Sequence, residues 1–472
     1  MGKYKRFGRN TIYVLLGNIS AKGIGFVMLP LYTRWLSVED YGISDIITVY
    51  VTLLLGIVSC CIAEAIFIFP KNKSKDVQKR YLSSALAFLS IISLIVLFVF
   101  LFIKLCSISW NVESSFTKYI WYIYALLLSQ ILQSISQQFT RSIDKMAIYS
   151  ITGIVVAIST AIFAFIFIPG RGVEGYIISL IIAHYCGSLF AIVASKSYRY
   201  ISVKSISLVS CKEMLMYSIP LIPNGIMWWM VNAINRPIME HYVGFHDIGI
   251  YAVANKFPSM LTVLLNVFVH SWQISVLEEF GKPSYSVFYN KLLRLFVILS
   301  SMLLLVMTLF SKQLVFLFTT SDYYEAWLYI PILTLGVVFS NLGGFAGGNF
   351  SAVKQSKYYF FSSMWAALSA LLFNTILIPV WGLIGAVTST LISFFVLAVS
   401  RFVYSSRFVK ANHILNYVII LLLNIILYLM MLLNINYCLC VLYATFVVFI
   451  YLIWQKDEIK KIKEYVVKKY SK

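Results

Sequence analysis

Charged side chains are scarce in this sequence, and their scarcity is the first constraint on its class. Only 12% of the 472 residues are Asp, Glu, Lys or Arg, whereas a soluble domain carries about 25%. Hydrophobic residues make up 60% of the chain, and the mean hydropathy is +0.86. This composition excludes a soluble enzyme and predicts a polytopic membrane protein.

Several chemical signatures are also missing. The seven cysteines occur without a CxxC pattern, so no metal site is expected. The sequence has no GxxxxGK[ST] loop for nucleotide phosphates, no paired catalytic carboxylates and no long outer loop that would carry an active site. We therefore expect no cofactor and no ATP hydrolysis by this chain, and a membrane enzyme such as a polymerase, ligase or glycosyltransferase is disfavoured.

Long apolar runs are abundant. A helix needs roughly 20 apolar residues to cross a hydrocarbon core of about 30 Å, and fourteen segments meet this requirement, which predicts an all-α fold. Two runs are too long for one crossing, so we expect hairpins that turn at 379–382 and at 434–436. The expected spans are 10–33, 43–70, 82–104, 119–139, 147–169, 174–195, 214–236, 248–276, 293–311, 327–352, 358–379, 383–400, 412–433 and 437–455.

Lys and Arg are distributed unevenly between the connections. Of the 38, thirty fall in the two tails and in every second connection, six fall on the opposite side, and Lys22 and Lys256 lie within spans. The positive-inside rule then places both termini in the cytoplasm. It also explains the net charge of +20 without a nucleic-acid partner.

The chain repeats itself weakly. Glu39-Asp-Tyr-Gly42 is matched 207 residues later by His246-Asp-Ile-Gly249, and Pro169-Gly-Arg-Gly-Val-Glu-Gly175 is matched at an offset of 210 by Pro379-Val-Trp-Gly-Leu-Ile-Gly385. These matches predict six-helix halves over 1–205 and 206–410, followed by two extra helices and a basic tail over 411–472. Because six is even, the halves would be parallel repeats about an axis along the membrane normal.

The motifs also carry a resemblance to a known family. Arg34-Trp-Leu-Ser-Val-Glu-Asp-Tyr-Gly42 resembles the "R-x-L-S-x-E-x-[FY]-G" signature of polysaccharide-repeat flippases, the O-antigen (Wzx-type) translocases. Tyr217-Ser-Ile-Pro-Leu-Ile-Pro223, followed by Gly249-Ile-Tyr-Ala-Val-Ala-Asn-Lys256, is similar to the pattern of that family's second half. The resemblance covers essentially the whole chain.

The resemblance implies the MATE-like fold of the multidrug/oligosaccharidyl-lipid/polysaccharide exporter superfamily, with two bundles around a cavity that opens alternately to each side. It implies an undecaprenyl-pyrophosphate-linked oligosaccharide, moved from the cytoplasmic to the outer leaflet of the bacterial inner membrane for O-antigen or capsular polysaccharide biosynthesis. A polysaccharide polymerase and a chain-length regulator are the protein partners it implies. This sequence departs from the family in one respect, because the family's cavities are described as cationic and the buried cations here are few.

The two lysines within spans are the leading candidates for binding an anionic head group. A lone Lys at the bilayer centre costs at least about 2.5 kcal/mol, so Lys22 should face a cavity or a partner such as Glu64. Lys256 would lie about 10 Å deep by helical rise or snorkel to the interface. Further polar residues occur at helical spacing along the expected spans, and we include them with the two lysines in the predicted binding site. The predicted substrate-binding residues are Lys22, Asn18, Arg34, Asn224, Trp228, Asn232, Asn235, Arg236, Lys256, Asn266, His270 and Gln273.

Two alternatives stay open. Each polar stripe also has a structural interpretation, because Asn and Gln join membrane helices by hydrogen bonds of about 1 kcal/mol. A cation-coupled exporter of drugs or other small molecules would have the same fold but would need a cluster of acids. Glu64 is the single acid well inside an expected span, and it is the candidate for ion coupling.

Overall fold

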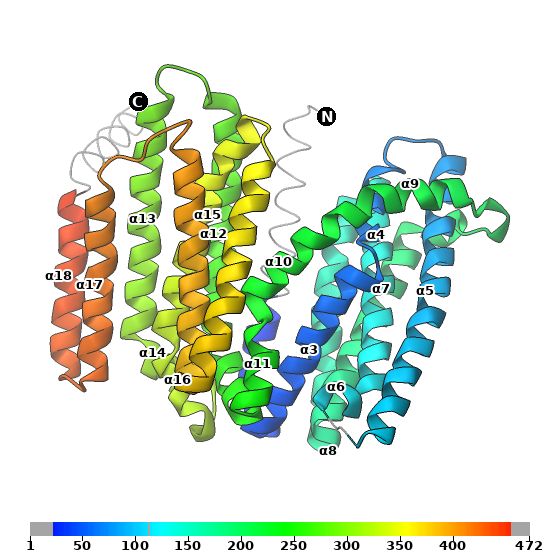
Figure 1. Ribbon diagram of the computed structural model, residues 1–472, viewed down its shortest axis with the longest axis horizontal. Coiled ribbons are helices and arrows are strands. Elements are labelled where there is room, and N and C mark those ends of the chain that lie inside the picture. Colours follow the sequence, from blue (N-terminus) through cyan, green and yellow to red (C-terminus); the bar gives the residue numbers. More distant parts are fainter. Residues whose placement is uncertain (1–21, 112–113, 455–472) are drawn as a thin grey trace, which may run out of the picture. The chain divides into compact units, whose positions relative to one another are not determined.

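Helices form every regular element in the described part of this computed structural model, which covers residues 22–111 and 114–454 (Figure 1). The chain divides into two compact units. Unit 1 comprises residues 22–256, 318–323 and 363–393, and unit 2 comprises residues 257–317, 324–362 and 394–454.

Unit 1 is built from the first half of the chain and the middle of α16. Its helices are α2 (Leu29–Trp35), α3 (Val38–Val58), α4 (Ile62–Ile68), α5 (Lys75–Ser109), α6 (Ser115–Lys118), α7 (Ile120–Ser142), α8 (Met146–Ser195), α9 (Leu208–Ser218), α10 (Ile222–Ala233), α11 (Asn235–Tyr242) and the start of α12 (Phe245–Glu279). Short 3-10 turns η1 (Ser197–Tyr200), η2 (Val203–Ser205) and η3 (Ile219–Leu221) connect α8, α9 and α10.

Unit 2 holds the rest of α12 and most of the later helices. These are α13 (Tyr285–Leu309), α14 (Ser311–Phe318), the 3-10 segment η4 (Ser321–Leu328), α15 (Ile330–Ala352), the two ends of α16 (Lys357–Ser405), α17 (Ile414–Leu432) and α18 (Tyr437–Trp454).

Two of the long helices are hairpins. In α16, Arg401 Nε donates to Ser362 Oγ at 3.2 Å although 39 residues separate them, a distance of about 58 Å in a straight helix. The chain reverses at Gly382, whose φ of +57° is readily adopted only by glycine. Gly172 has the same conformation, with φ of +53°, at the reversal of α8. The predicted turn at 379–382 is confirmed.

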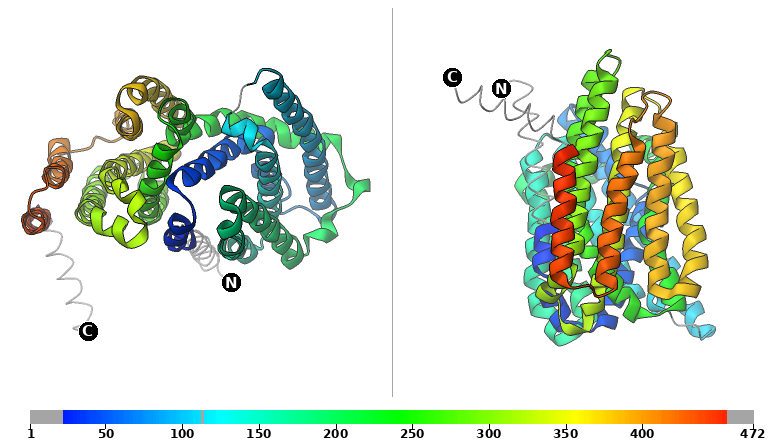
Figure 2. Two further views of the ribbon diagram at one scale, coloured as in Figure 1. Left: turned by 90° about the horizontal axis from the view of Figure 1, so that it is seen from below. Right: turned by 90° about the vertical axis from the view of Figure 1, so that its left-hand side faces the viewer.

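The second predicted hairpin joins α17 and α18. These helices run side by side against α13 (Figure 2), with the turn beginning at Asn434, which has a φ of +52°. Asn424 Nδ2 donates to Ser301 Oγ at 2.6 Å and to Tyr451 OH at 3.1 Å, which ties α17 to both neighbouring helices. The hairpin is therefore attached to unit 2 by buried polar contacts as well as by apolar packing.

One predicted span is broken rather than continuous. The segment 43–70 divides into α3 and α4 because Cys60 and Cys61 both adopt left-handed backbone angles, with φ of +47° and +52°. Glu64 follows in the first turn of α4. No Gly or Pro occupies the break, so the sequence pattern does not reveal it.

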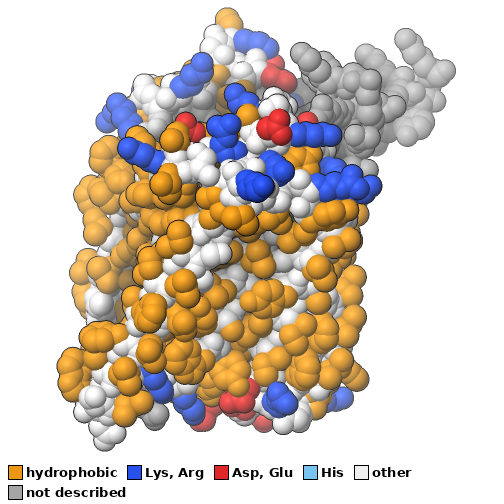
Figure 3. Space-filling model, turned by 90° about the vertical axis from the view of Figure 1, so that its right-hand side faces the viewer, with side chains coloured by type: hydrophobic (Ala, Val, Ile, Leu, Met, Phe, Trp, Pro, Cys, Tyr) orange, Lys and Arg blue, Asp and Glu red, His pale blue; other side chains and the backbone are white. Residues whose placement is uncertain are grey.

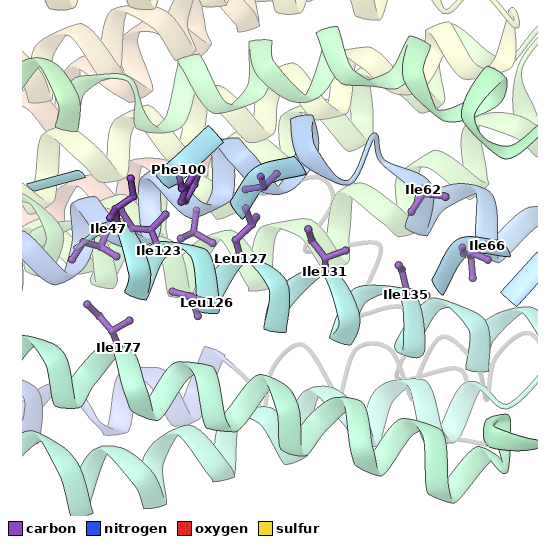
Figure 4. Close-up of a cluster of buried hydrophobic side chains, with 14 of the residues drawn as sticks. Ile47, Ile62, Ile66, Phe100, Ile123, Leu126, Leu127, Ile131, Ile135 and Ile177 are labelled. Atoms are coloured by element: carbon purple, nitrogen blue, oxygen red, sulfur yellow. The ribbon is translucent and has the colours of Figure 1, made fainter. Parts of the chain in front are cut away.

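The core of unit 1 is centred on α7. Apolar side chains recur along this helix at spacings of one to four residues and meet side chains from α3, α4, α5 and α8 (Figure 4). Because lipid is as apolar as these side chains, van der Waals packing, and not transfer from water, stabilises their contacts. The labelled members are Ile47, Ile62, Ile66, Phe100, Ile123, Leu126, Leu127, Ile131, Ile135 and Ile177.

The core of unit 2 is aromatic. The ring of Trp272 stacks on Phe345 with centroids 4.3 Å apart, and its Nε1 donates to the Phe345 carbonyl at 2.8 Å. Tyr289 packs against both rings. The stack fixes α12, α13 and α15 to one another.

Surface composition agrees with a membrane protein. Nine helices in the described part are long and apolar enough to span a bilayer, and two of these are the hairpins α8 and α16. Figure 3 shows hydrophobic side chains over the middle of one face and Lys and Arg gathered mainly at its upper end. The predicted fold class, an all-α polytopic membrane protein, is confirmed, with the number of spans approximate.

One cation does not lie where the sequence suggests. The local pattern places Arg401 in a connection because it follows an apolar run, but it lies inside α16 and is only 4% exposed. Its guanidinium stacks over the Tyr359 ring, 5.2 Å from the centroid. It therefore belongs to the interior of unit 2 and not to the loop charges.

Candidate functional site

Lys22 and Lys256 lie close together in unit 1. Their ammonium groups are near enough to repel each other, although 234 positions separate the two residues in the sequence. The charge of Lys256 also acts on the phenols of Tyr32 and Tyr176, whose rings meet edge to face with centroids 5.4 Å apart. Lys22 is exposed and Lys256 is half-buried. The structure therefore brings together the two lysines that the sequence singled out.

The start of α3 shows what the signature motif does locally. Ser37 caps the helix by accepting a hydrogen bond from the Asp40 amide at 3.1 Å, and Glu39 and Asp40 place negative charge in the first turn, where the helix dipole favours it. The Tyr323 hydroxyl donates to the carbonyls of Leu36 and Ser37 at 3.0 and 2.9 Å. Burial raises the pKa of Tyr323, which keeps the phenol protonated as a donor.

Two glycines let α3 and α12 cross with their backbones in contact. A Cβ added at Gly42 would overlap the Phe245 carbonyl oxygen and stand 2.9 Å from the Gly249 nitrogen. A Cβ added at Gly249 would overlap the Val38 carbonyl oxygen in the same way. The contact is reciprocal, because Phe245 follows Val38 at the same 207-residue offset that relates the two glycines. A side chain at either position would force the helices apart.

A buried ion pair reinforces this crossing. Arg236 is 5% exposed, and its Nε lies 3.2 Å from Asp45 Oδ2. The guanidinium lies over the Tyr251 ring, 4.4 Å from its centroid, and donates to Asn235 Oδ1 at 3.0 Å and to the Asn232 carbonyl. These contacts join α3, α11 and α12. Arg236 and Asn235 are thus held within a packed network, which favours the structural interpretation for both.

Glu240 forms another polar junction in unit 1. Its carboxylate accepts hydrogen bonds from Tyr50 OH at 2.5 Å, from the Ser115 amide at 3.0 Å and from Ser115 Oγ at 2.6 Å. A cavity of about 540 Å³ adjoins it, and Lys118 and His241 are among the residues that line it. None of the predicted site residues is among those that line this cavity.

The remaining predicted residues of the seventh and eighth spans lie on α10 and α12. Asn224 and Asn232 on α10 are exposed, and Asn232 Nδ2 donates to the Trp228 carbonyl of its own helix at 2.7 Å. Asn266 and His270 on α12 are exposed and Gln273 is half-buried, and all three belong to unit 2, whereas Lys256 belongs to unit 1.

Three of the predicted residues belong to the first two expected spans and to the connection between them. Arg34 is exposed at the end of α2. Glu64 is exposed next to the break in the second span, and no described residue forms an ion pair with it, so the expected pairing with Lys22 is not present in the described structure. Asn18 lies outside the described residues.

Sequence reasoning missed Asp45 as an interior acid. It lies two turns into α3, and its partner Arg236 is 191 residues away. The one available signal was a carboxylate within an expected apolar span, the same signal that identified Glu64. No group of three or more His, Cys, Asp or Glu side chains that could hold a metal ion occurs in the described ranges.

The amino-acid sequence is similar to that of known proteins. The family described as polysaccharide biosynthesis protein matches residues 7–272, more than half of the chain. The capsular polysaccharide biosynthesis protein CapF of Staphylococcus aureus is 22% identical over 411 residues, which cover 84% of this chain and 99% of CapF.

Two solved structures show the same fold. The lipid II flippase MurJ, in an inward closed conformation, superimposes with a TM-score of 0.73 at 16% identity, covering 95% of this chain and 99% of MurJ. A point mutant of the Vibrio cholerae MATE transporter VcmN gives a TM-score of 0.59 at 14% identity, covering 85% of this chain and 96% of VcmN.

Proposed function

Because the chain belongs to the polysaccharide biosynthesis protein family, we propose that it is a flippase for an undecaprenyl-pyrophosphate-linked oligosaccharide repeat unit. The protein is a transporter related to lipid-linked polysaccharide synthesis, not an enzyme. It moves the lipid-linked unit from the cytoplasmic to the outer leaflet by alternating access. The product serves O-antigen or capsular polysaccharide assembly, and the name of the CapF relative supports the capsular case.

The observation that carries this proposal is the proximity of Lys22 and Lys256. Two like charges held near each other within membrane-spanning segments are costly, and an anion bound between them would relieve the repulsion. A pyrophosphate head is multiply anionic and cannot enter hydrocarbon unless water or fixed cations replace its hydration. The pair therefore serves as the anchor for the head group while the glycan is carried across.

Internal equivalence supports alternating access by the halves 1–205 and 206–410. Gly42 and Gly249 make reciprocal contacts, and Gly172 and Gly382 share one unusual backbone conformation at an offset of 210 residues. Each half thus contributes an equivalent glycine to the α3–α12 crossing and has a matching hairpin. Residues 411–472 add two helices and a basic tail to this repeat.

The orientation in the membrane follows from charge. This multi-pass protein lies in the bacterial inner membrane with both termini in the cytoplasm, which the gathering of Lys and Arg at one end in Figure 3 supports. Its substrate partner is the undecaprenyl-pyrophosphate-linked glycan. A polysaccharide polymerase and a chain-length regulator act on the product at the outer surface.

A cation-coupled small-molecule exporter is the competing function, because VcmN shares the fold. Such an exporter needs an acid that is available to bind and release a cation. Asp45 is engaged by Arg236, and Glu240 accepts three hydrogen bonds. Glu64 remains the candidate for ion coupling, and it lies apart from any acidic cluster in the described residues.

Deletion of the gene tests the transport step. The cell should accumulate lipid-linked oligosaccharide on the inner leaflet while glycan synthesis continues, since the chain supplies no catalytic group. The readout is the accessibility of the linked oligosaccharide to a membrane-impermeant glycan label. Loss of the linked oligosaccharide itself would instead indicate an enzyme.

Charge substitutions test the anchor. Lys22→Gln and Lys256→Gln should each lower surface glycan about tenfold or more, because a hydrogen bond to a charged group contributes about 1.5–3 kcal/mol. Lys→Arg at either position should retain much of the activity. Lys73→Gln, at an exposed loop position, is the matched control. Full surface glycan from both Gln variants, with equal protein in the membrane, would show that the lysines are structural.

A further inference from the structure

A second cavity lies in unit 2, and neither Lys22 nor Lys256 is among its lining residues. It encloses about 390 Å³ between α14, η4 and the turn that joins α17 to α18. Its lining includes Lys312, Gln313, Phe316, Tyr324, Met431 and Tyr437. None of these residues takes part in the function proposed above.

Helix α13 locates this cavity relative to the bilayer. Near the start of α13, Asn290 donates to the Lys410 carbonyl at 3.1 Å and accepts from the Asn412 amide at 2.6 Å, so the connection between α16 and α17, which carries Arg407 and Lys410, lies at that end. Lys312 follows directly after the other end of α13. The rise from Asn290 to Lys312 is about 33 Å. The cavity therefore lies at the membrane boundary opposite the basic connections of unit 2.

Its polar part is organised around one ammonium group. Lys312 Nζ lies 4.3 Å from the centroid of the Trp327 ring and 3.3 Å from Asn434 Oδ1. The neutral side chains of Gln313 and Tyr437 line the cavity beside it. No carboxylate in the described ranges pairs with Lys312. The cation is thus positioned by neutral groups, which leaves its charge to be balanced by a ligand.

The rim of the cavity is apolar. Phe316, which lines the cavity, is 80% exposed. Leu433, which precedes Asn434 in the adjoining turn, is 75% exposed, and exposed leucines continue along α17 and α18. An ammonium on an indole ring beside exposed apolar side chains is typical of the membrane–water interface. A soluble anion would satisfy the ammonium and leave the rim in water, whereas an amphiphile would satisfy both.

We propose that this cavity binds the head group of an anionic phospholipid, with the phosphate on Lys312 and the acyl chains over Phe316 and Leu433. The ligand is a resident lipid of the surrounding leaflet, not the transported substrate. It would hold the α17–α18 hairpin against α14 and η4, because the cavity contains side chains from all of these elements. The inference goes beyond the proposed flippase activity and does not depend on it.

Native mass spectrometry of the purified full-length protein tests the site. The wild type is titrated with phosphatidylglycerol and with phosphatidylcholine, and the number and affinity of bound lipids are compared. Phosphatidylglycerol should be preferred, and Lys312→Gln should weaken its binding about fivefold, the scale of one basic side chain at an anionic membrane surface. Lys312→Arg should retain the preference, and so should Lys354→Gln, an exposed control in the same unit.

Four results would overturn the proposal. They are equal phosphatidylglycerol binding by the wild type and Lys312→Gln, an equal loss in the Lys354→Gln control, displacement of the lipid by millimolar inorganic phosphate, and preferential retention of undecaprenyl phosphate. The third would make the cavity a simple anion site, and the fourth would assign it to the transported lipid. Should Lys312→Gln be poorly folded, Phe316→Ser keeps the charge and removes the rim, and it should also weaken binding.

Discussion

The crossing of α3 and α12 makes a sharp prediction for the substitution Gly42→Ala. The new methyl group would overlap the Phe245 carbonyl oxygen and crowd the Gly249 nitrogen. Both obstacles are backbone atoms of a helix, so neither can rotate away as the tip of a side chain would. The two helices must separate, which also disturbs the neighbouring Asp45–Arg236 pair.

The change in the free energy of unfolding caused by Gly42→Ala is the sum of two opposing effects. Overpacking a well-packed site costs about 1–3 kcal/mol, and rigid backbone obstacles place Gly42→Ala near the upper end. Replacing Gly by Ala within a helix contributes up to about 1 kcal/mol in the stabilising direction. We therefore expect a net loss of about 2 kcal/mol in the free energy of unfolding.

Gly56→Ala is the matched control. Gly56 lies in the same helix, and a Cβ there would meet no atom within 4 Å. This variant should be as stable as the wild type or up to about 1 kcal/mol more stable. The two Ala variants should therefore differ by about 3 kcal/mol in denaturant unfolding of the detergent-purified protein. Equal stability of Gly42→Ala and Gly56→Ala would refute the packing argument.

The reciprocal geometry adds a second comparison. Gly249→Ala should destabilise the protein about as much as Gly42→Ala, since each methyl group meets a carbonyl of the opposite helix. One displacement of the helices would accommodate both methyl groups, so the double variant should lose less than the sum of the two single losses. Strict additivity would mean that the two sites are independent.

Three further outcomes are expected. Asp45→Asn should lower the free energy of unfolding by about 3 kcal/mol, because it leaves Arg236 buried without its counter-charge; a double-mutant cycle with Arg236→Gln that shows no coupling would exclude the pair as a stabilising contact. Asn424→Leu should lower the free energy of unfolding by only about 0.6–1 kcal/mol, although Asn424 makes hydrogen bonds to two side chains, because such bonds are weak in membrane proteins. A much larger loss, with the α17–α18 hairpin unfolding first, would contradict this. Reporter fusions after residues 75, 200 and 405 should read cytoplasmic and those near 111, 244 and 322 external, and one clear reversal among them would contradict the proposed orientation.

The spans and their hairpins were predictable because they depend on local quantities. An apolar run of 43 residues without a charge cannot cross the bilayer once, so the reversal at Gly382 follows from length alone. These features involve only neighbouring residues.

The contacts between charged residues in the interior could not be predicted from local sequence patterns. Asp45 and Arg236 are brought together by the packing of α3 against α11 and α12, which no local pattern encodes. The pattern misplaces Arg401 because a cation at the end of an apolar run looks the same locally whether it is buried or in a loop. Lys22 and Lys256 are recognisable individually through the cost of a charge in hydrocarbon, but their proximity comes from the fold.

The break between α3 and α4 has a consequence for solvent. Two successive left-handed residues interrupt the regular ladder of backbone hydrogen bonds, and irregular backbone at membrane depth persists only where protein covers it or water reaches it. Cys60 and Cys61 are half-buried and Glu64, in the next turn, is exposed. Hydration at this level would satisfy the interrupted peptide groups and the carboxylate together. The thickness of hydrocarbon that a passing polar group must traverse is then set by the length of α3, not by the whole of the predicted span 43–70.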